Sequence, residues 1–228
     1  LTGINASVSS STHLDSNNTV AIGGVVSATN SVAVGKSALS NNTSGGWNTA
    51  VGMYSLLNNT TGISNTAIGY GALDANTTAA SNTAVGDTAA GANTTGTRNT
   101  VVGHEALRHN TTGSDNVALG KDAMSANTTA SNNTAVGKSA LGANTTGASN
   151  TAIGYVALNA NTTASNNTAV GADALYANTT GDNNTAVGGL SGDALTIGNS
   201  NVSVGYNSLT TEVAGDRSVA VGHGSLAL

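Results

Sequence analysis

One pentapeptide, Asn-Thr-Ala-Val-Gly, recurs with small variations along the chain at a fixed interval of 17 residues. Only the first step, from Gly23 to Gly35, is shorter, at 12 residues. A fixed period of this size predicts a solenoid, in which each repeat forms one coil stacked on the next. The closing glycine of the repeat falls at Gly35, Gly52, Gly69, Gly86, Gly103, Gly120, Gly137, Gly154, Gly171, Gly188, Gly205 and Gly222.

Each repeat holds two short apolar or β-branched segments, Thr-Ala-Val before the glycine and Ala-Leu after it, separated by turn-forming Gly, Asn and Ser. Both segments are too short for a helix. We therefore expect an all-β fold, a parallel β-solenoid or β-roll with two short strands in each 17-residue coil. Coils that pair at ~4.8 Å would build a rod about 53 Å long over eleven steps.

The regularity of the repeat divides the chain into three parts. Residues 1–34 are expected to form irregular amino-terminal coils or a cap, and residues 35–188 the regular β-roll. Residues 189–228 hold degenerate coils that form a junction or a second cap.

Two apolar positions of the repeat are predicted to stack as ladders in the core. The first is the branched residue just before each glycine, from Val34 to Val221. The second is the leucine four residues after the glycine, from Leu39 to Leu226, with Met124 in line. Charged residues avoid both positions and lie one, two, five, eleven or twelve residues after the glycine, with Glu212 the exception. We expect those five positions to face solvent.

Asparagine also repeats in register, four residues before each glycine from Asn48 to Asn201, and at a second position from Asn42 to Asn178. Stacked side-chain amides can bond from coil to coil and satisfy the backbone of turns, so both sets are predicted to form ladders. The same residues contribute to seventeen Asn-x-Ser/Thr sequons, which follow from the consensus. In a source that glycosylates secreted proteins, we would expect decoration of the Asn-Thr-Thr turn at every coil.

The composition excludes several classes of protein. The chain has six Lys and Arg residues and a net charge of −5, so it offers no basic patch for nucleic acid. It has no cysteine and no apolar run of ~18 residues, which argues against disulfides and against membrane insertion by this segment. It begins at Leu1 without a signal sequence, and we interpret it as a piece of a longer protein.

Scattered acidic residues argue against catalysis, because an active site needs titratable groups that converge on a cleft. His104 beside Glu105 is the best candidate pair, and we interpret it as a solvated surface pair. The histidines show no metal-ligand spacing. We therefore predict no enzymatic activity, no cofactor and no metal.

Each coil offers one Val or Ile, one Leu and a few Ala to a core. At about 25 cal/mol per Å2 of buried apolar area, so thin a roll hardly offsets the ordering entropy of its residues. The small Ala and Thr residues of the strand, which alternate with Val, would leave a smooth face for packing against identical copies. We therefore expect a homo-oligomeric fibre.

The segments Asn30–Gly35 (Asn-Ser-Val-Ala-Val-Gly) and Ser218–Gly222 (Ser-Val-Ala-Val-Gly) resemble the Ser-Val-Ala-Ile-Gly repeats in the YadA-like heads of trimeric autotransporter adhesins. Similar arrays occur in fibre proteins of phages and bacteria. The resemblance implies a left-handed β-roll and a homotrimer. It also implies a location outside the cell, on an outer membrane-attached surface fibre or on a virion fibre, and binding to a glycan or protein on a host or prey surface.

The predicted function is adhesion, or the spacing of a separate binding tip. A ligand would contact the variable turn residues, which follow successive glycines, and two aromatic residues near the amino-terminal end. These candidates are Lys36, Met53, Tyr70, His104, Lys121, Lys138 and Tyr155, with Trp47 and Tyr54. The alternative is an ice-binding or carbohydrate-binding β-solenoid. Ice binding would use the threonine that lies eight residues after the glycine from Thr43 to Thr196, although turn chemistry also explains that residue.

Overall fold

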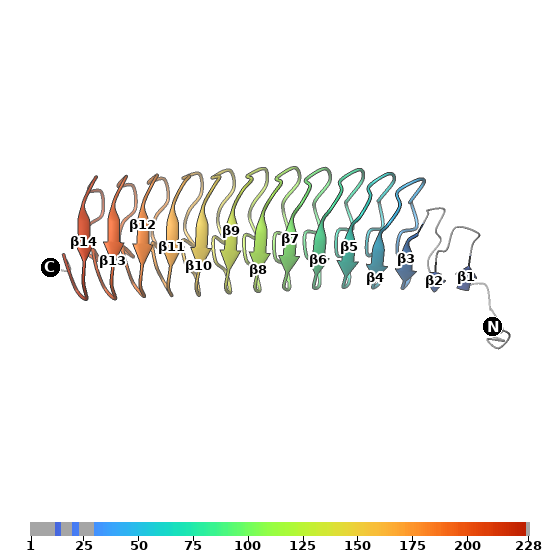
Figure 1. The fold of residues 1–228 in the computed structure, drawn as a ribbon, viewed down its shortest axis with the longest axis horizontal. Helices are drawn as coiled ribbons and strands as arrows, with labels where there is room; N and C mark the ends of the chain where they lie inside the picture. The colour runs from blue at the N-terminus through green and yellow to red at the C-terminus, as the bar shows by residue number, and fades with distance from the viewer. Residues whose placement is uncertain (1–11, 15–19, 23–29, 227–228) are drawn as a thin grey trace.

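The computed structural model describes residues 12–14, 20–22 and 30–226, and most of the expected cap at residues 1–34 lies outside this part. The described residues form fourteen three-residue strands in a single sheet, ordered as in the sequence. The coils stack side by side along the long axis of the molecule, from β1 to β14 (Figure 1). The strands are β1 (Thr12–Leu14), β2 (Val20–Ile22), β3 (Val32–Val34), β4 (Thr49–Val51), β5 (Thr66–Ile68), β6 (Thr83–Val85), β7 (Thr100–Val102), β8 (Val117–Leu119), β9 (Thr134–Val136), β10 (Thr151–Ile153), β11 (Thr168–Val170), β12 (Thr185–Val187), β13 (Val202–Val204) and β14 (Val219–Val221).

The strands pair in the register that the repeat predicts. From β3 onward each strand is parallel to the next, and equivalent residues of successive coils are partners, as in Ala50 with Ala67. The pairing also follows the short first repeat, because Ala21 of β2 pairs with Ala33 of β3. Strand β1 pairs with β2 in the antiparallel sense. The parallel β-solenoid with 17-residue coils is therefore confirmed.

The described residues include no helix long and apolar enough to cross a membrane.

The prediction of two strands per coil is wrong, because the Ala-Leu segment after the glycine is a turn. Ser37 and Leu39 have φ angles of 59° and 51°, in the left-handed region that strands do not use. The main chain of this segment bonds alternately within its coil, from Ala38 N to Gly35 O, and to the next coil, from Leu39 N to Ser55 O. A left-handed leucine costs roughly 1–2 kcal/mol. Complete burial of its side chain offsets that cost.

The core differs from the prediction in one respect. The leucine ladder is confirmed from Leu39 to Leu209 and includes Met124, whereas Leu226 in the last described coil is exposed. The residue before each glycine, however, points outward, and the central alanine of the strand points inward. Side chains alternate along a strand, so the inward asparagine just before it places Thr outward, Ala inward and Val outward. The predicted valine core ladder is therefore wrong.

Both asparagine ladders are confirmed. In the ladder from Asn48 to Asn201, the Oδ1 of Asn48 accepts a bond from the main-chain N of Asn65 at 2.9 Å. The Nδ2 of Asn65 then donates to the carbonyl of Ala79 at 2.8 Å. In the second ladder, the Nδ2 of Asn76 donates to the Oδ1 of Asn59 at 2.8 Å. All these amides are buried, and their hydrogen bonds fix the turns of each coil to those of its neighbours.

The repeated glycine permits the close stacking of coils. Gly120 has a φ of 137°, and a Cβ built on it would lie 2.5 Å from the carbonyl oxygen of Gly137 in the next coil. Any side chain here would push the two coils apart.

Candidate functional surface

The outward side chains of strands β3 to β14 form a continuous surface that we call the Thr/Val face. It consists of the first residue of each strand, which is Thr or Val, and the third residue, which is Val, Ile or Leu. None of these positions carries a charge. The third residues are substantially exposed, for example 39% for Ile68 and 41% for Val102. A row of branched apolar side chains therefore runs along the surface of the rod.

The Thr/Val face is nearly as uniform as the core. By contrast, the residue that follows each glycine, which we call the turn row, is Lys, Met, Tyr, Asp, His, Ala or Gly in different coils. Both sets of residues are partly or fully exposed. Exposed side chains without a constant partner are free to vary between repeats, as the turn row does. The Thr/Val face is therefore uniform from coil to coil where the turn row varies.

The structure places the predicted turn residues together in this exposed row, on successive coils. Lys36, Met53, Tyr70, His104, Lys121, Lys138 and Tyr155 are all exposed. Few of them make contacts that fix their side chains. The Tyr54 ring packs edge-on against Tyr70, with centroids 5.8 Å apart, and the Nζ of Lys138 lies 5.8 Å from the centre of the Tyr155 ring.

Trp47 and Tyr54 do not lie in one row. Trp47 is 60% exposed and precedes strand β4, whereas Tyr54 follows that strand and is half-buried. Trp47 belongs to what we call the edge row, the residue two before each strand, and the turn row lies beyond the other end of the strands. The two aromatic residues thus lie at opposite ends of one strand.

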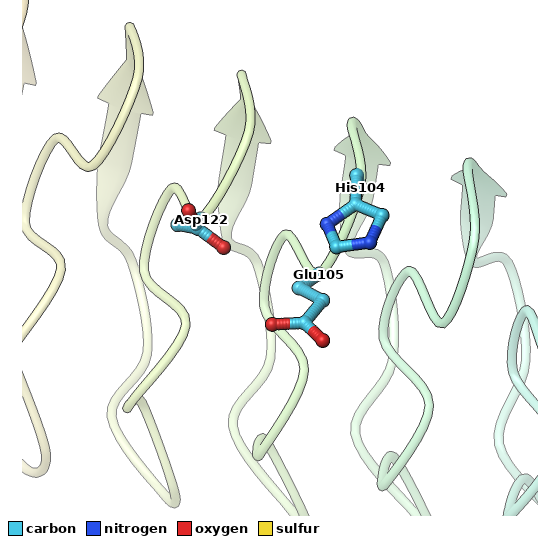
Figure 2. A group of neighbouring side chains, drawn as sticks. All are labelled: His104, Glu105 and Asp122. Carbon is cyan, nitrogen blue, oxygen red and sulfur yellow. The ribbon is translucent and has the colours of Figure 1, made fainter.

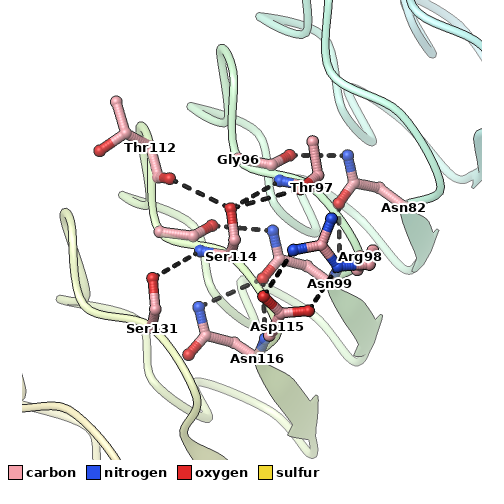
Figure 3. Close-up of polar contacts among 11 residues, drawn as sticks. Asn82, Gly96, Thr97, Arg98, Asn99, Thr112, Ser114, Asp115, Asn116 and Ser131 are labelled. Atoms are coloured by element: carbon pink, nitrogen blue, oxygen red, sulfur yellow. Dashed lines mark hydrogen bonds and ion pairs between the residues drawn. The ribbon is translucent and has the colours of Figure 1, made fainter.

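The edge row also contains the clearest ion pair. Arg98 Nε and Nη2 donate to Asp115 Oδ1 and Oδ2 of the next coil at 2.6 and 2.8 Å, beside the ladder residues Asn99 and Asn116 (Figure 3). This hydrogen bonding lowers the pKa of Asp115 and raises that of Arg98. The positions of Arg98 and Asp115 in the repeat predicted that both are exposed but not that they are partners. The signal was available, because residues 17 apart lie on adjacent coils.

Three potential metal ligands gather on the turns after β7 and β8. Ligand atoms of His104, Glu105 and Asp122 all lie within 4.8 Å of one another (Figure 2). Cations already accompany both carboxylates, since Arg108 Nη1 lies 2.8 Å from Glu105 and Lys121 Nζ lies 3.7 Å from Asp122. The cluster is at the surface and forms a network of ion pairs. His104 and Glu105 were the candidate pair from the sequence, and Asp122 was not included, although its 17-residue spacing from Glu105 indicates that the two lie on adjacent coils.

Two aspartates at the fifth position after the glycine are half-buried. Burial raises the pKa of both Asp74 and Asp193, and the nearby charge of Asp173 contributes a further increase at Asp193. The Oδ1 of Asp193 has no hydrogen-bond partner among the described residues.

The threonines considered for ice binding use their hydroxyls within the protein. Thr94 Oγ1 donates to the carbonyl of Thr111 at 2.9 Å, and the same bond recurs from coil to coil. These residues therefore perform the turn chemistry that the sequence also allowed. The threonines of the Thr/Val face point their side chains outward instead.

No protein-family model, curated protein or solved structure matches the chain. The case for a function therefore rests on the surfaces described above.

Proposed function

We propose that this chain is a structural and adhesive segment of an extracellular fibre, built from three identical copies whose Thr/Val faces pack together around the fibre axis. The observation that carries the proposal is the exposed, uncharged and uniform Thr/Val face. Apolar stripes of this length rarely face water in a monomer, and they mark surfaces where proteins associate.

A second copy of the chain is the partner that fits this face best. A partner that contacts every coil must repeat with the same rise, and an identical array has that rise by construction. Cyclic symmetry with its axis along the rod gives every copy the same contact and leaves no face uncovered. The number three follows from the resemblance to the heads of trimeric autotransporter adhesins, as does the location on a cell surface or virion.

In this assembly the turn row is the adhesive surface. Its exposed residues differ from coil to coil, which suits contact with a glycan or protein on a host or prey surface. Contacts that are weak individually add up when they are repeated along three linked chains. Where the turn row makes no contact, the same rod serves to hold a separate tip away from its anchor.

The test is the mass of the purified chain in solution by light scattering. We expect three times the chain mass of 21.9 kDa. Val102→Asp and Val136→Asp, which place charges on the Thr/Val face, are expected to lower the mass. Ala172→Asp places the same charge on the turn row and is the matched control, so its mass should not change. A wild-type monomer would contradict the proposal.

A second function, ice binding, is favoured by one feature of the same face. Threonine and valine ranks lie two residues apart on the strands, about 6.6 Å, and recur every ~4.8 Å between coils. Such an array of hydroxyl and methyl groups is a regular template for ordered water. Ice binding requires the Thr/Val face to be uncovered, so it becomes the leading proposal only if the chain is monomeric. Thermal hysteresis that disappears in Val102→Asp would support it.

A further inference from the structure

We propose that Asn132, Asn166 and Asn183 are the N-glycosylation sites of the folded chain, and that the fold prevents modification of the other described sequons. We call a sequon closed where the fold keeps an enzyme from contacting both its asparagine amide and its hydroxyl. The sugar donor would be a hexose activated by a diphosphate leaving group. The amide nitrogen forms a bond to the anomeric carbon and loses a proton, and the leaving group departs with the electrons of the broken C–O bond. The hydroxyl residues that follow these three asparagines lie on the Thr/Val face, so the proposal applies to the folded chain before assembly covers that face.

The sequons of the second asparagine ladder are closed for two reasons. Their amides are buried and hydrogen-bonded, as in Asn93, whose Nδ2 donates to Gly96 O at 2.9 Å and to Asn76 Oδ1 at 3.3 Å. The hydroxyl residue two positions later, Thr95, is exposed on the outer surface. The amide and the hydroxyl of one sequon therefore lie on opposite sides of the wall of the coil, where one enzyme cannot contact both.

Three other described sequons are closed in different ways. In Asn201-Val-Ser, both Asn201 and Ser203 are buried. In the sequons at Asn41 and Asn58 the asparagine is exposed, but the hydroxyl is engaged: Thr43 donates to Thr60 O and Thr60 to Thr77 O. Sequons at positions 5 and 17 lie outside the described residues.

Only three sequons in the described part of the chain present both halves on one side. Asn132, Asn166 and Asn183 are exposed members of the edge row, with φ angles of 61–63°. Their side-chain amides form no hydrogen bond within the described residues. The hydroxyl residues two positions later begin β9, β11 and β12 and point outward, because residues i and i+2 share a face. The expectation of one glycan per coil is therefore replaced by three sites along one edge of the sheet.

The experiment uses Val102→Asp, which is expected to leave the Thr/Val face uncovered, made in a host without N-glycosylation and incubated while folded with UDP-glucose and a soluble N-glycosyltransferase. The enzyme is chosen because it modifies short free peptides spanning Asn93 and Asn132. Peptide mapping is expected to find hexose at Asn132, Asn166 and Asn183, with modification at Asn93 at least tenfold slower than in its peptide. Equal rates at Asn93 in peptide and folded chain would overturn the proposal, as would no hexose at the three edge-row sites.

A pair of variants separates recognition of the sequon from damage to the fold. Thr134→Val removes the hydroxyl but keeps Asn132, and should abolish transfer at Asn132 alone. Thr151→Val changes the equivalent residue of β10, whose edge-row neighbour is Ser149, and should leave all three sites unchanged. Loss at Asn166 in either variant would instead show that transfer reports on the fold.

Discussion

The regular coils at residues 35–188 and the coils at 189–226 follow one backbone path with different interiors. In the regular coils alanine faces inward at the centre of the strand and again three residues after the glycine, with Val101 and Ser55 the exceptions. In the later coils Ser191, Ser203 and Ser208 take such places, and their buried hydroxyls lie 2.6–3.2 Å apart. An apolar core has become a small hydroxyl network, and the coil still closes.

The asparagine ladders differ between the same two regions. The ladder that begins at Asn48 continues to Asn201, whose Oδ1 accepts a bond from Ser218 N. The other ladder stops at Asn178, because the next coils carry buried Leu195 and half-exposed Glu212 there. Asn178 Oδ1 is consequently buried without a partner. The comparison indicates that the glycine and the first ladder define the coil, while the second ladder adds stability where it is present.

The largest expected effect is at the repeated glycine. Gly120→Ala would bring a Cβ to 2.5 Å from the carbonyl of Gly137, in a strained backbone conformation. We expect a loss of several kcal/mol in the free energy of unfolding, measured by denaturant titration. Gly222→Ala has the same kind of φ angle but no atom within 4 Å, so about 1–3 kcal/mol is expected. Equal losses would show that coil contact is unimportant.

Within the second ladder, removal from the middle should cost more than removal from the end. Asn110→Ala leaves Asn93 Oδ1 without its buried donor, leaves Gly113 O with the amide of Asn99 as its remaining side-chain donor, and takes an acceptor from Asn127. We expect a loss on the order of 3 kcal/mol in unfolding free energy. Asn178→Ala also removes an unpaired oxygen and should cost at least 1 kcal/mol less, by roughly the penalty for one buried unsatisfied group. The reverse order would contradict the ladder account.

The serine network should be sensitive to partial removal. Ser203→Ala restores the alanine of the regular coils but takes a partner from both Ser191 and Ser208, so we expect a loss of about 1 kcal/mol. The triple change of Ser191, Ser203 and Ser208 to Ala leaves no hydroxyl unpaired and should be closer to wild type than the single change. A triple variant less stable than Ser203→Ala would show that the hydroxyls are needed together. Thermal unfolding provides the measurement.

The smallest expected effect is a dependence on pH at Asp193. Its pKa is raised in the folded chain, so the folded state binds the proton more tightly than the unfolded state. The stability of the later coils should therefore fall as pH rises from the ordinary aspartate value of 3.8 through the raised value. Asp193→Asn should remove this part of the pH dependence, measured by amide hydrogen exchange in residues 189–226. Arg98 and Asp115 act in the opposite sense, because their bond is lost on acidification.

The period alone predicted the coil, its register and both asparagine ladders, because equivalent residues of successive coils lie one period apart. It did not determine which strand residues face inward. Hydrophobicity favours Val over Ala for the core, but the inward asparagine before the strand decides the alternation and places Ala inside. The strand predicted at Ala-Leu fails because the left-handed φ of residues such as Leu39 has no signature in the sequence.

The exposed turn row was predicted correctly from the positions of charged residues, yet its neighbours across coils were not. Arg98 with Asp115, and Glu105 with Asp122, are each separated by one period, so the same arithmetic that gave the ladders could have paired them. The Thr/Val face could not be recognised until the direction of the strand residues was known. Like a buried surface, this face is uncharged and uniform, and it exists only in the folded array.

Because successive coils bond in the same register, the number of coils sets the length of the rod. Contacts between coils of the regular region recur with the 17-residue period, so removing residues 121–137 joins Gly120 to Lys138 and recreates the junctions that were lost. Removing or adding one repeat therefore changes the length of the rod by one coil of ~4.8 Å. The cross-section of the rod, and the surfaces that it presents, stay the same.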